Sequence, residues 1–212
     1  MSIELRHLAI TKPDQKPLFS EVNLVVNSGE VACIMGPSGV GKSTLLSAIG
    51  GHLNHHFKMS GELLLNSKSI VHLEARKRSI GLLFQDPLLF PHLSVGDNLA
   101  YGLSPNLKGK RERRSAVEEA LSQAQLDGFY DRDPTTLSGG QQGRAALMRA
   151  ILAKPSALLL DEPFSKLDVK LRQSMREFLF SQAKSANIPM IIVTHDPLDA
   201  AHATGSVIEL KA

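Results

Sequence analysis

The chain contains a single cysteine, no tryptophan and no long apolar segment, and each absence excludes a class of protein. Aromatic residues make up only 5% of the 212 residues. The chain therefore has few side chains on which the bases of a single-stranded nucleic acid could stack. One cysteine cannot form an internal disulfide, and Cys33, within the apolar run 31–35, is expected to be a buried hydrophobic residue. No segment approaches the ~20 apolar residues of a membrane span. The charged N-terminus does not fit a signal peptide, so we expect a soluble, cytoplasmic protein.

An excess of one charge sign is also absent. The chain has 24 Lys and Arg against 21 Asp and Glu, a net charge of +3, which is too small to argue for nucleic acid as the main partner. Hydrophobic residues at 42% exclude collagen-like and disordered classes. The length is that of one domain carrying a modest insertion.

Short strand patterns separated by helical patterns predict an α/β fold with a mostly parallel core sheet. Nearly continuous apolar runs, typical of parallel strands covered on both faces, occupy residues 31–35, 80–84, 157–160 and 190–193. Runs that mix polar and apolar residues favour a flanking antiparallel sheet and include residues 3–10 and 62–65. Two further strand patterns lie at 22–26 and 207–210.

The middle of the chain differs from its flanks. Residues 86–154 lack continuous apolar strands and predict an inserted helical subdomain. Its helical patterns lie at 95–102, 111–125 and 141–153. Residues 1–85 and 155–212 would then form a nucleotide-binding core, within one domain that spans 1–212. An amphipathic helix is predicted over 169–186, with its apolar stripe in the core.

A phosphate-binding loop stands between an apolar strand and the helical pattern that starts at Thr44. Its pattern, G-x-x-x-x-G-K-[ST], is made by Gly36, Pro37, Ser38, Gly39, Val40, Gly41, Lys42 and Ser43. The glycines let the backbone N–H groups turn toward phosphate oxygens at the start of a helix. Lys42 would bridge the β- and γ-phosphates, and the Ser43 hydroxyl would bind Mg²⁺.

Two carboxylates, Asp161 and Glu162, end the apolar run 157–160. In α/β proteins that end of the sheet carries the site. Asp161 would hold Mg²⁺ through water, and Glu162 could activate the attacking water as general base. The alternative is that the pair caps the next helix.

The segment Leu137-Ser138-Gly139-Gly140-Gln141 begins another helical pattern. A helix start with two glycines can bind an anion. Taken alone, it could equally be a serine helix cap without a ligand.

Together these motifs, in this order, resemble the ATP-binding-cassette (ABC) ATPases along essentially the whole chain. Residues 36–43 match Walker A, 137–141 match the LSGGQ signature, and Walker B ends at Asp161 and Glu162. Gln85 stands at the Q-loop, residues 165–168 look like the D-loop, and Thr194-His195-Asp196 looks like the switch-histidine segment. The resemblance implies the ABC ATPase variant of the P-loop NTPase fold.

The resemblance further implies a head-to-tail homodimer that sandwiches two ATP molecules, each with Mg²⁺. Signature residues Ser138, Gly139, Gly140 and Gln141 would contact the γ-phosphate bound by the other subunit. His195 would contact the same phosphate, Gln85 would link Mg²⁺ and water to the helical subdomain, and Asp168 would connect the two sites. ATP binding would close the dimer, and hydrolysis would release it.

Three positions depart from the family pattern. The stretch Thr11–Gln15, where an aromatic residue usually stacks on adenine, contains none, and we expect the nearest aromatic, Phe19, to be core. Base selectivity is therefore open. Gly143 replaces a usual Gln within the signature helix, at a helix-propensity cost of about 1 kcal/mol. Lys166 replaces a small D-loop residue, with an effect of unknown sign.

Residues 83–103 resemble the Q-loop region of bacterial importer ATPases for thiamine, polyamines, iron and sulfate, and the short YnjD-like ATP-binding proteins most of all. In that family this region forms the groove for a membrane permease, served by a solute-binding protein. We therefore expect a subunit on the cytoplasmic face of the inner membrane. Few residues follow His195, so we expect no appended regulatory domain. Alternatives are an exporter or lipoprotein-release ATPase, or a soluble ABC ATPase without a transport role.

Two polar clusters are expected to be solvated surface segments rather than ligand sites. The basic run 108–114 is expected to be a solvated turn and first helical turn rather than a nucleic-acid or lipid site. His52, His55 and His56 are expected to lie in a solvated loop rather than at a metal.

Overall fold

A computed structural model describes residues 1–165 and 167–211, so the effect expected of Lys166 lies outside the described residues. The chain forms two compact units. The first comprises residues 1–82, 156–162 and 180–212, and the second comprises 83–155 and 163–179. The helical unit thus includes residues 163–179, which the sequence analysis placed with the nucleotide-binding core.

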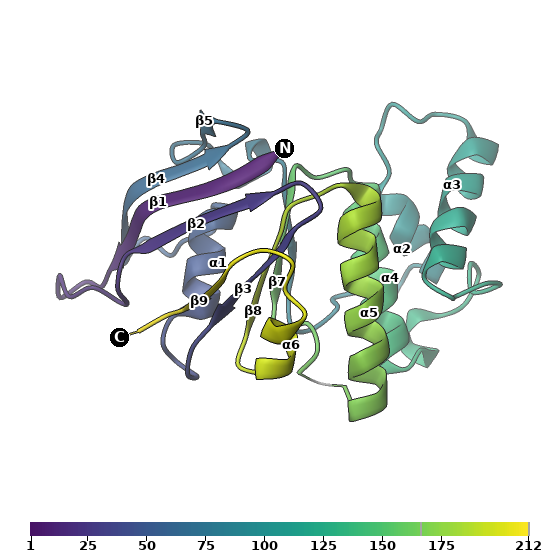
Figure 1. Cartoon of the computed structure of the whole chain (residues 1–212). Coiled ribbons are helices and arrows are strands. Elements are labelled where there is room, and N and C mark those ends of the chain that lie inside the picture. The colour runs from purple at the N-terminus through teal and green to yellow at the C-terminus, as the bar shows by residue number, and fades with distance from the viewer. Residues whose placement is uncertain (166, 212) are drawn as a thin grey trace. The chain divides into compact units, whose positions relative to one another are not determined.

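A five-stranded sheet, drawn in Figure 1, lies at the centre of the first unit, with the strand order β6-β7-β8-β3-β9. Its strands are β3 (Val31–Met35), β6 (Ile80–Leu83), β7 (Ala157–Asp161), β8 (Met190–Thr194) and β9 (Val207–Glu209). Strand β8 pairs in parallel with both β3 and β7, and β9 pairs in parallel with β3. Four of the five residues in both β3 and β7 are buried, and all five in β8 are. The parallel core predicted from continuous apolar runs is confirmed.

A second, antiparallel sheet has the strand order β2-β1-β4-β5. It consists of β1 (Ser2–Thr11), β2 (Val22–Asn27), β4 (Lys58–Leu65) and β5 (Lys68–Ser69). In β2 buried and exposed residues alternate strictly, because one face of the sheet packs on the core and the other faces water. The two-residue strand β5 was not predicted, since its sequence is too short to show a period.

Helix α1 (Lys42–Gly50) joins both sheets into one core. Leu45 and Ile49 of α1 belong to the same buried cluster as strand residues from both sheets. Cys33 and Phe19 are 0% and 2% exposed, which confirms both as core residues. The unit also contains a 3-10 turn at Ala75–Lys77 and the short helix α6 (Pro197–Ala201).

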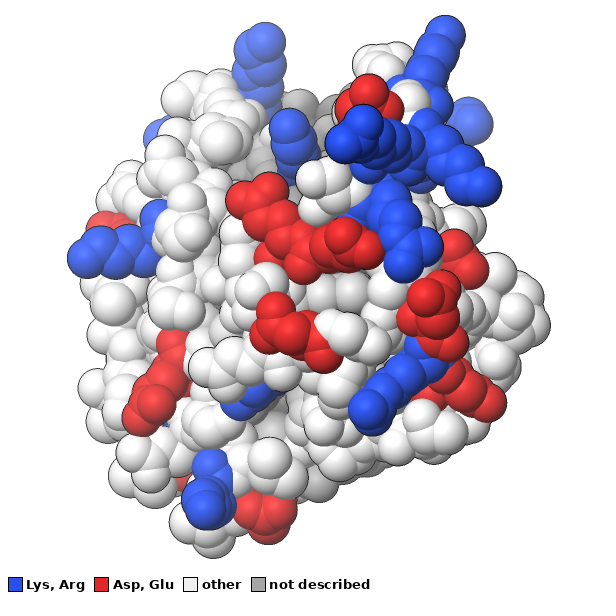
Figure 2. Space-filling model, turned by 90° about the vertical axis from the view of Figure 1, so that its right-hand side faces the viewer, with Lys and Arg blue, Asp and Glu red and all other residues white. Residues whose placement is uncertain are grey.

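The second unit is helical. It contains α2 (Val95–Gly102), α3 (Lys110–Gln123), a 3-10 turn at Pro134–Thr136 and α4 (Gly139–Leu152). Helix α5 (Val169–Ala186) begins in this unit and ends in the first. Its predicted apolar stripe is buried, with Met175 and Leu179 at most 1% exposed. Figure 2 shows Lys and Arg side chains gathered at the end of this unit where α3 begins.

No helix in the described part of the chain is both long and apolar enough to cross a membrane.

Candidate functional site

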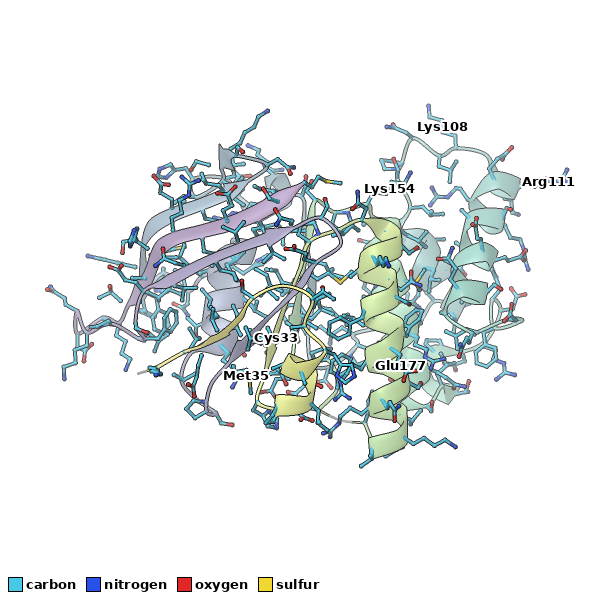
Figure 3. The ribbon with its side chains drawn as sticks, in the orientation of Figure 1. Cys33, Met35, Lys108, Arg111, Lys154 and Glu177 are labelled. Atoms are coloured by element: carbon cyan, nitrogen blue, oxygen red, sulfur yellow. The ribbon has the colours of Figure 1, made fainter. Side chains whose placement is uncertain are left out.

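The predicted site residues fall into two groups, one in each unit. The first group starts at the phosphate loop, which connects β3 to α1 beyond Met35, a residue labelled in Figure 3. Gly36, Gly39 and Gly41 have φ angles of 153°, 82° and 110°. The last two lie in the left-handed region that glycine tolerates best. A Cβ on Gly41 would stand 2.6 Å from Cδ2 of Leu18, so this position has no room for a side chain.

The Lys42 side chain curls back over its own loop. Its Nζ donates to the carbonyls of Gly36 and Pro37 at 2.7 and 3.2 Å, and the residue is only 6% exposed. The ammonium also lies 3.7 Å from the Glu162 carboxylate. The positive charge of Lys42 therefore lies inside the turn of the phosphate loop, at the N-terminus of α1.

The two acids at the end of β7 have different surroundings. Burial raises the pKa of Asp161, and a hydrogen bond from the Ser43 hydroxyl and the charge of Lys42 partly counteract that rise. Glu162 has a φ of 44°, an uncommon left-handed conformation that is frequent at functional sites. Its N–H donates to Val193 O at 3.0 Å. This backbone bend turns Glu162 toward the phosphate loop.

His195 follows strand β8 and meets the same carboxylate. Its Nδ1 lies 3.2 Å from Oε1 of Glu162. The preceding Thr194 hydroxyl donates to the buried Asp199 carboxylate at 2.6 Å and accepts from the N–H of Asp196 at 3.0 Å. The structure therefore brings Lys42, Ser43, Asp161, Glu162 and His195 together from three parallel strands and the loops that follow them.

The signature segment in the second unit forms the start of α4. Ser138 is the N-cap of this helix, and it makes a capping box with Gln141. The Ser138 N–H donates to Oε1 of Gln141 at 2.9 Å, and the Gln141 N–H donates back to the serine hydroxyl at 3.4 Å. A Cβ on Gly140 would approach Cδ2 of Leu171 to 3.2 Å. Ser138 therefore caps α4, as one of the two sequence interpretations predicted. Binding of an anion by the two glycines stays a prediction.

The predicted Q-loop and D-loop residues also lie in the second unit. Nε2 of Gln85 donates to the Ser165 hydroxyl at 2.8 Å. Asp168 caps α5, because its Oδ1 accepts from the N–H of Leu171 at 3.0 Å. Gln85 and the D-loop segment are therefore in direct contact.

Two residues that sequence reasoning missed shape the segment after Gln85. Asn98, 0% exposed, bonds both the N–H and the carbonyl of Phe90, at 2.8 and 3.0 Å. Arg149 donates to the carbonyls of Leu88 and Pro87 at 3.0 and 3.2 Å. A cavity of about 210 Å³ adjoins this segment. It is lined by Asp86, Pro87, Leu88, Leu89, Pro91, Pro134, Thr135 and Gln142. A polar residue inside the apolar pattern 95–99 was the available signal for Asn98.

A third missed residue, Arg78, anchors the far end of the phosphate-loop helix. Its guanidinium, 5% exposed, donates to the carbonyls of Ala48 and Ile49 at 2.8 and 2.7 Å. It also reaches those of Val71 and Leu73, both at 2.9 Å. Burial lowers its pKa. No sequence pattern could have identified Arg78, because all its partners are backbone carbonyls, which every amino acid carries.

The histidines of the loop after α1 remain at the surface, and His52, His55 and His56 are all exposed. Within the described residues, no group of three or more His, Cys, Asp or Glu side chains could hold a metal ion.

Comparisons with known proteins identify the family of the chain. The family model for ABC transporters matches residues 19–165. The uncharacterized ABC transporter ATP-binding protein YnjD of Escherichia coli K12 is 47% identical over 206 residues, which cover 97% of this chain and 94% of that protein. The sulfate/thiosulfate import ATP-binding protein CysA of Methylococcus capsulatus is 40% identical over 100% of this chain and 61% of its own length. The chain thus spans less than two thirds of that longer relative.

Among solved structures, the dimeric post-hydrolysis state of the ATP-binding cassette MJ0796 bound to ADP and Pi matches with a TM-score of 0.80. It is 31% identical, and the match covers 99% of this chain and 94% of that one. The family model covers more than half of the chain, and a relative 47% identical over nearly its whole length agrees with it, so the chain belongs to the ABC transporter family of ATPases.

Proposed function

We propose that this chain is the ATP-binding and ATP-hydrolysing subunit of a bacterial importer, and that Glu162 is its general base. The observation that carries the proposal is the convergence on Oε1 of Glu162, where Lys42 Nζ lies at 3.7 Å and His195 Nδ1 at 3.2 Å. A carboxylate beside a phosphate-binding lysine can accept a proton from a water aligned with the γ-phosphate. The relatives that are import ATPases support the transport role.

In this proposal, the phosphate loop from Gly36 to Ser43 cradles the β- and γ-phosphates with its N–H groups. Thr44, next along α1, would contact the α-phosphate. Lys42 would exchange its bonds to the carbonyls of Gly36 and Pro37 for bonds to phosphate oxygens, which are charge-assisted and stronger. His195, exposed over 57% of its side chain beside Glu162, would donate to the γ-phosphate.

The residues present also fit Mg²⁺. The Ser43 hydroxyl and the Asp161 carboxylate are hydrogen-bonded to each other, and both are the hard oxygen ligands that Mg²⁺ prefers. With so few protein ligands, phosphate oxygens and water would complete an octahedral shell, as is usual for Mg²⁺ with nucleotides. The ion would neutralise charge on the phosphates.

The signature would act on the ATP of a second copy of the chain. The capping box between Ser138 and Gln141 uses two of the donors at the start of α4. No described residue accepts from the N–H groups of Gly139 and Gly140, which therefore can bind an anion. Asp168, as the cap of α5, would hold the D-loop between the two sites. The dimeric state of the related ATP-binding cassette supports this arrangement.

The partner would be a separate membrane permease, docked at the cavity beside residues 86–91, with a solute-binding protein acting on the permease's other side. Asn98 and Arg149 fix the backbone of that segment, and Leu88 is 58% exposed on it. An exposed apolar side chain on a fixed backbone is suited to a protein contact. The chain would accordingly sit on the cytoplasmic face of the inner membrane.

The decisive experiment compares Glu162→Gln with Glu177→Gln. Glu177, labelled in Figure 3, is an exposed residue of α5 whose one side-chain bond among the described residues is with Gln173 at 3.1 Å, so the same chemical change there is a matched control. We expect Glu162→Gln to bind MgATP, to hydrolyse it roughly 10²–10⁴ times more slowly, and to elute as a dimer in size-exclusion chromatography with MgATP. The control should hydrolyse normally. A Glu162→Gln variant that stays monomeric at high concentration and hydrolyses normally contradicts the proposal.

A further inference from the structure

Three basic side chains that form no ion pair with a described carboxylate lie at one end of the helical unit. Lys108, Lys110 and Arg111, called here the basic end, lie where the loop after α2 enters α3, and all three are exposed. Figure 3 labels Lys108 and Arg111 at that end, and the Lys and Arg side chains gathered there are visible in Figure 2. No carboxylate of the described residues forms an ion pair with any of the three.

Two of the neighbouring acids pair with another residue, and a third lies at the basic end itself. The Glu112 carboxylate folds back over Gly109, close enough that a Cβ there would overlap it, and so faces the start of α3, where the helix dipole favours a negative charge. Glu118 and Asp131 both pair with Arg114, at 2.9 and 3.5 Å. Glu112 therefore offsets part of the positive charge, and the basic end keeps a net positive charge because none of its three cations forms an ion pair with a described carboxylate.

The backbone that carries the basic end is fixed in place. Arg113, the next residue but one after Arg111, turns inward and donates to the carbonyls of Ala100, Ser104 and Leu107 at 2.8, 3.2 and 3.0 Å. These bonds tie the loop before α3 to the last turn of α2. Binding through the basic end therefore requires little ordering of the backbone, and loses little free energy to it.

An amphipathic aromatic residue stands on the same last turn. Tyr101 is 72% exposed, and its ring meets Phe90 edge-on with centroids 5.0 Å apart. Its neighbour Ala100 is the residue whose carbonyl accepts from Arg113. Tyrosine is enriched at membrane–water boundaries because its ring is apolar and its hydroxyl polar.

We propose that, contrary to the interpretation of residues 108–114 from sequence alone, the basic end, with Tyr101 on the last turn of α2, binds the anionic lipid headgroups of the membrane in which the permease lies. The location at a membrane rests on the proposed function. Long side chains without ion pairs suit mobile phosphates on a lipid surface, because no fixed geometry has to be matched. Each charge near an anionic leaflet strengthens binding, and a cluster of three with an aromatic anchor gives weak, reversible adhesion that complements docking on the permease.

The test is co-sedimentation of the full chain with protein-free vesicles, either phosphatidylcholine containing phosphatidylglycerol or phosphatidylcholine alone. The variant Lys108→Gln/Lys110→Gln/Arg111→Gln is compared with Lys58→Gln/Lys68→Gln/Lys184→Gln. The second triple removes the same charge at exposed positions of the first unit. Each lost contact should weaken partitioning about fivefold, so the first triple should bind anionic vesicles about 100-fold less tightly. The second should bind almost as the wild type.

Binding of the wild type should disappear at about 1 M salt, where the Debye length is about 3 Å, and should be absent with phosphatidylcholine alone. Equal loss in both triples would mean that net charge, not the basic end, drives binding, and would overturn the proposal. So would unchanged vesicle binding by the first triple with weaker co-purification of the permease, which would assign the basic end to a protein contact. Because ATPase activity and permease binding are measured separately, a failure of lipid binding leaves the proposed function standing.

Discussion

Replacing Arg78 by Met tests whether a guanidinium bonded only to backbone carbonyls holds the phosphate-loop helix in place. The substitution removes hydrogen bonds to four carbonyls, at 2.7 to 2.9 Å. Within the described part of the chain, Ala48 O alone retains another donor, the N–H of Gly51 at 3.3 Å. Ile49 O is then left without a partner at a buried site, and Val71 O and Leu73 O at part-buried ones, at about 1–3 kcal/mol each. Methionine restores some apolar packing and buries no charge, so we expect a net loss of about 3–5 kcal/mol in the free energy of unfolding.

Arg76→Met is the matched control, because Arg76 stands two residues earlier, its side chain is 76% exposed, and its ion-pair partner in the described structure is Glu74 alone. A surface ion pair of this kind contributes little to stability. Urea denaturation followed by circular dichroism measures both variants, and Arg78→Lys should fall between wild type and Arg78→Met, because an ammonium can still reach some of the carbonyls. Equal stability of Arg78→Met and Arg76→Met would refute the argument that these four bonds stabilise the helix.

Three further predictions concern the site and its helices. Lys42→Ala should abolish tight nucleotide binding in equilibrium titration, because it removes the one ammonium beside the loop carbonyls, and tight binding by this variant would contradict the role given to Lys42. Gly143→Ala should raise the free energy of unfolding by about 0.5–1 kcal/mol, since a Cβ there would meet Met175 at an ordinary 3.6 Å; a destabilised variant would show that the helix needs this glycine. ATP and GTP should bind with similar affinities in a competition series, because residues 11–15 offer no aromatic ring, and a strong preference for ATP would require a base contact from another residue.

Much of the fold could be predicted because its strands are buried on both faces. Continuous apolar runs such as 31–35 and 157–160 have no other stable arrangement at that length, and the bounds of β3 match the prediction residue for residue. The starts of α2 and α5 also match the prediction, but two other helix starts were less accurate. Helices α1 and α4 begin at Lys42 and Gly139, two residues before the predicted starts, because glycine-rich loop sequence conceals a helix start that propensity alone disfavours.

The residues that sequence reasoning missed share one property: they bond backbone atoms. Arg78, Asn98 and Arg149 direct their polar groups mainly at carbonyls brought close by the fold. Motifs record residues that meet a ligand, whereas the carbonyl partners of these three can belong to any amino acid. Their function appears only when the chain path is known, and each of them fixes a segment that carries a predicted site residue or the cavity next to one.

The signature segment shows how one set of atoms can serve both folding and function. Ser138 and Gln141 satisfy each other's backbone N–H groups in a capping box, which stabilises α4 in a single chain. The N–H groups of Gly139 and Gly140 lie between them, and a side chain on Gly140 would crowd Leu171. In the proposed dimer, the capped helix would present two backbone donors without any rearrangement, and a phosphate bound by a second subunit would accept from them while the cap stays intact. The serine cap, which the geometry shows, is therefore compatible with the phosphate contact, which stays a prediction.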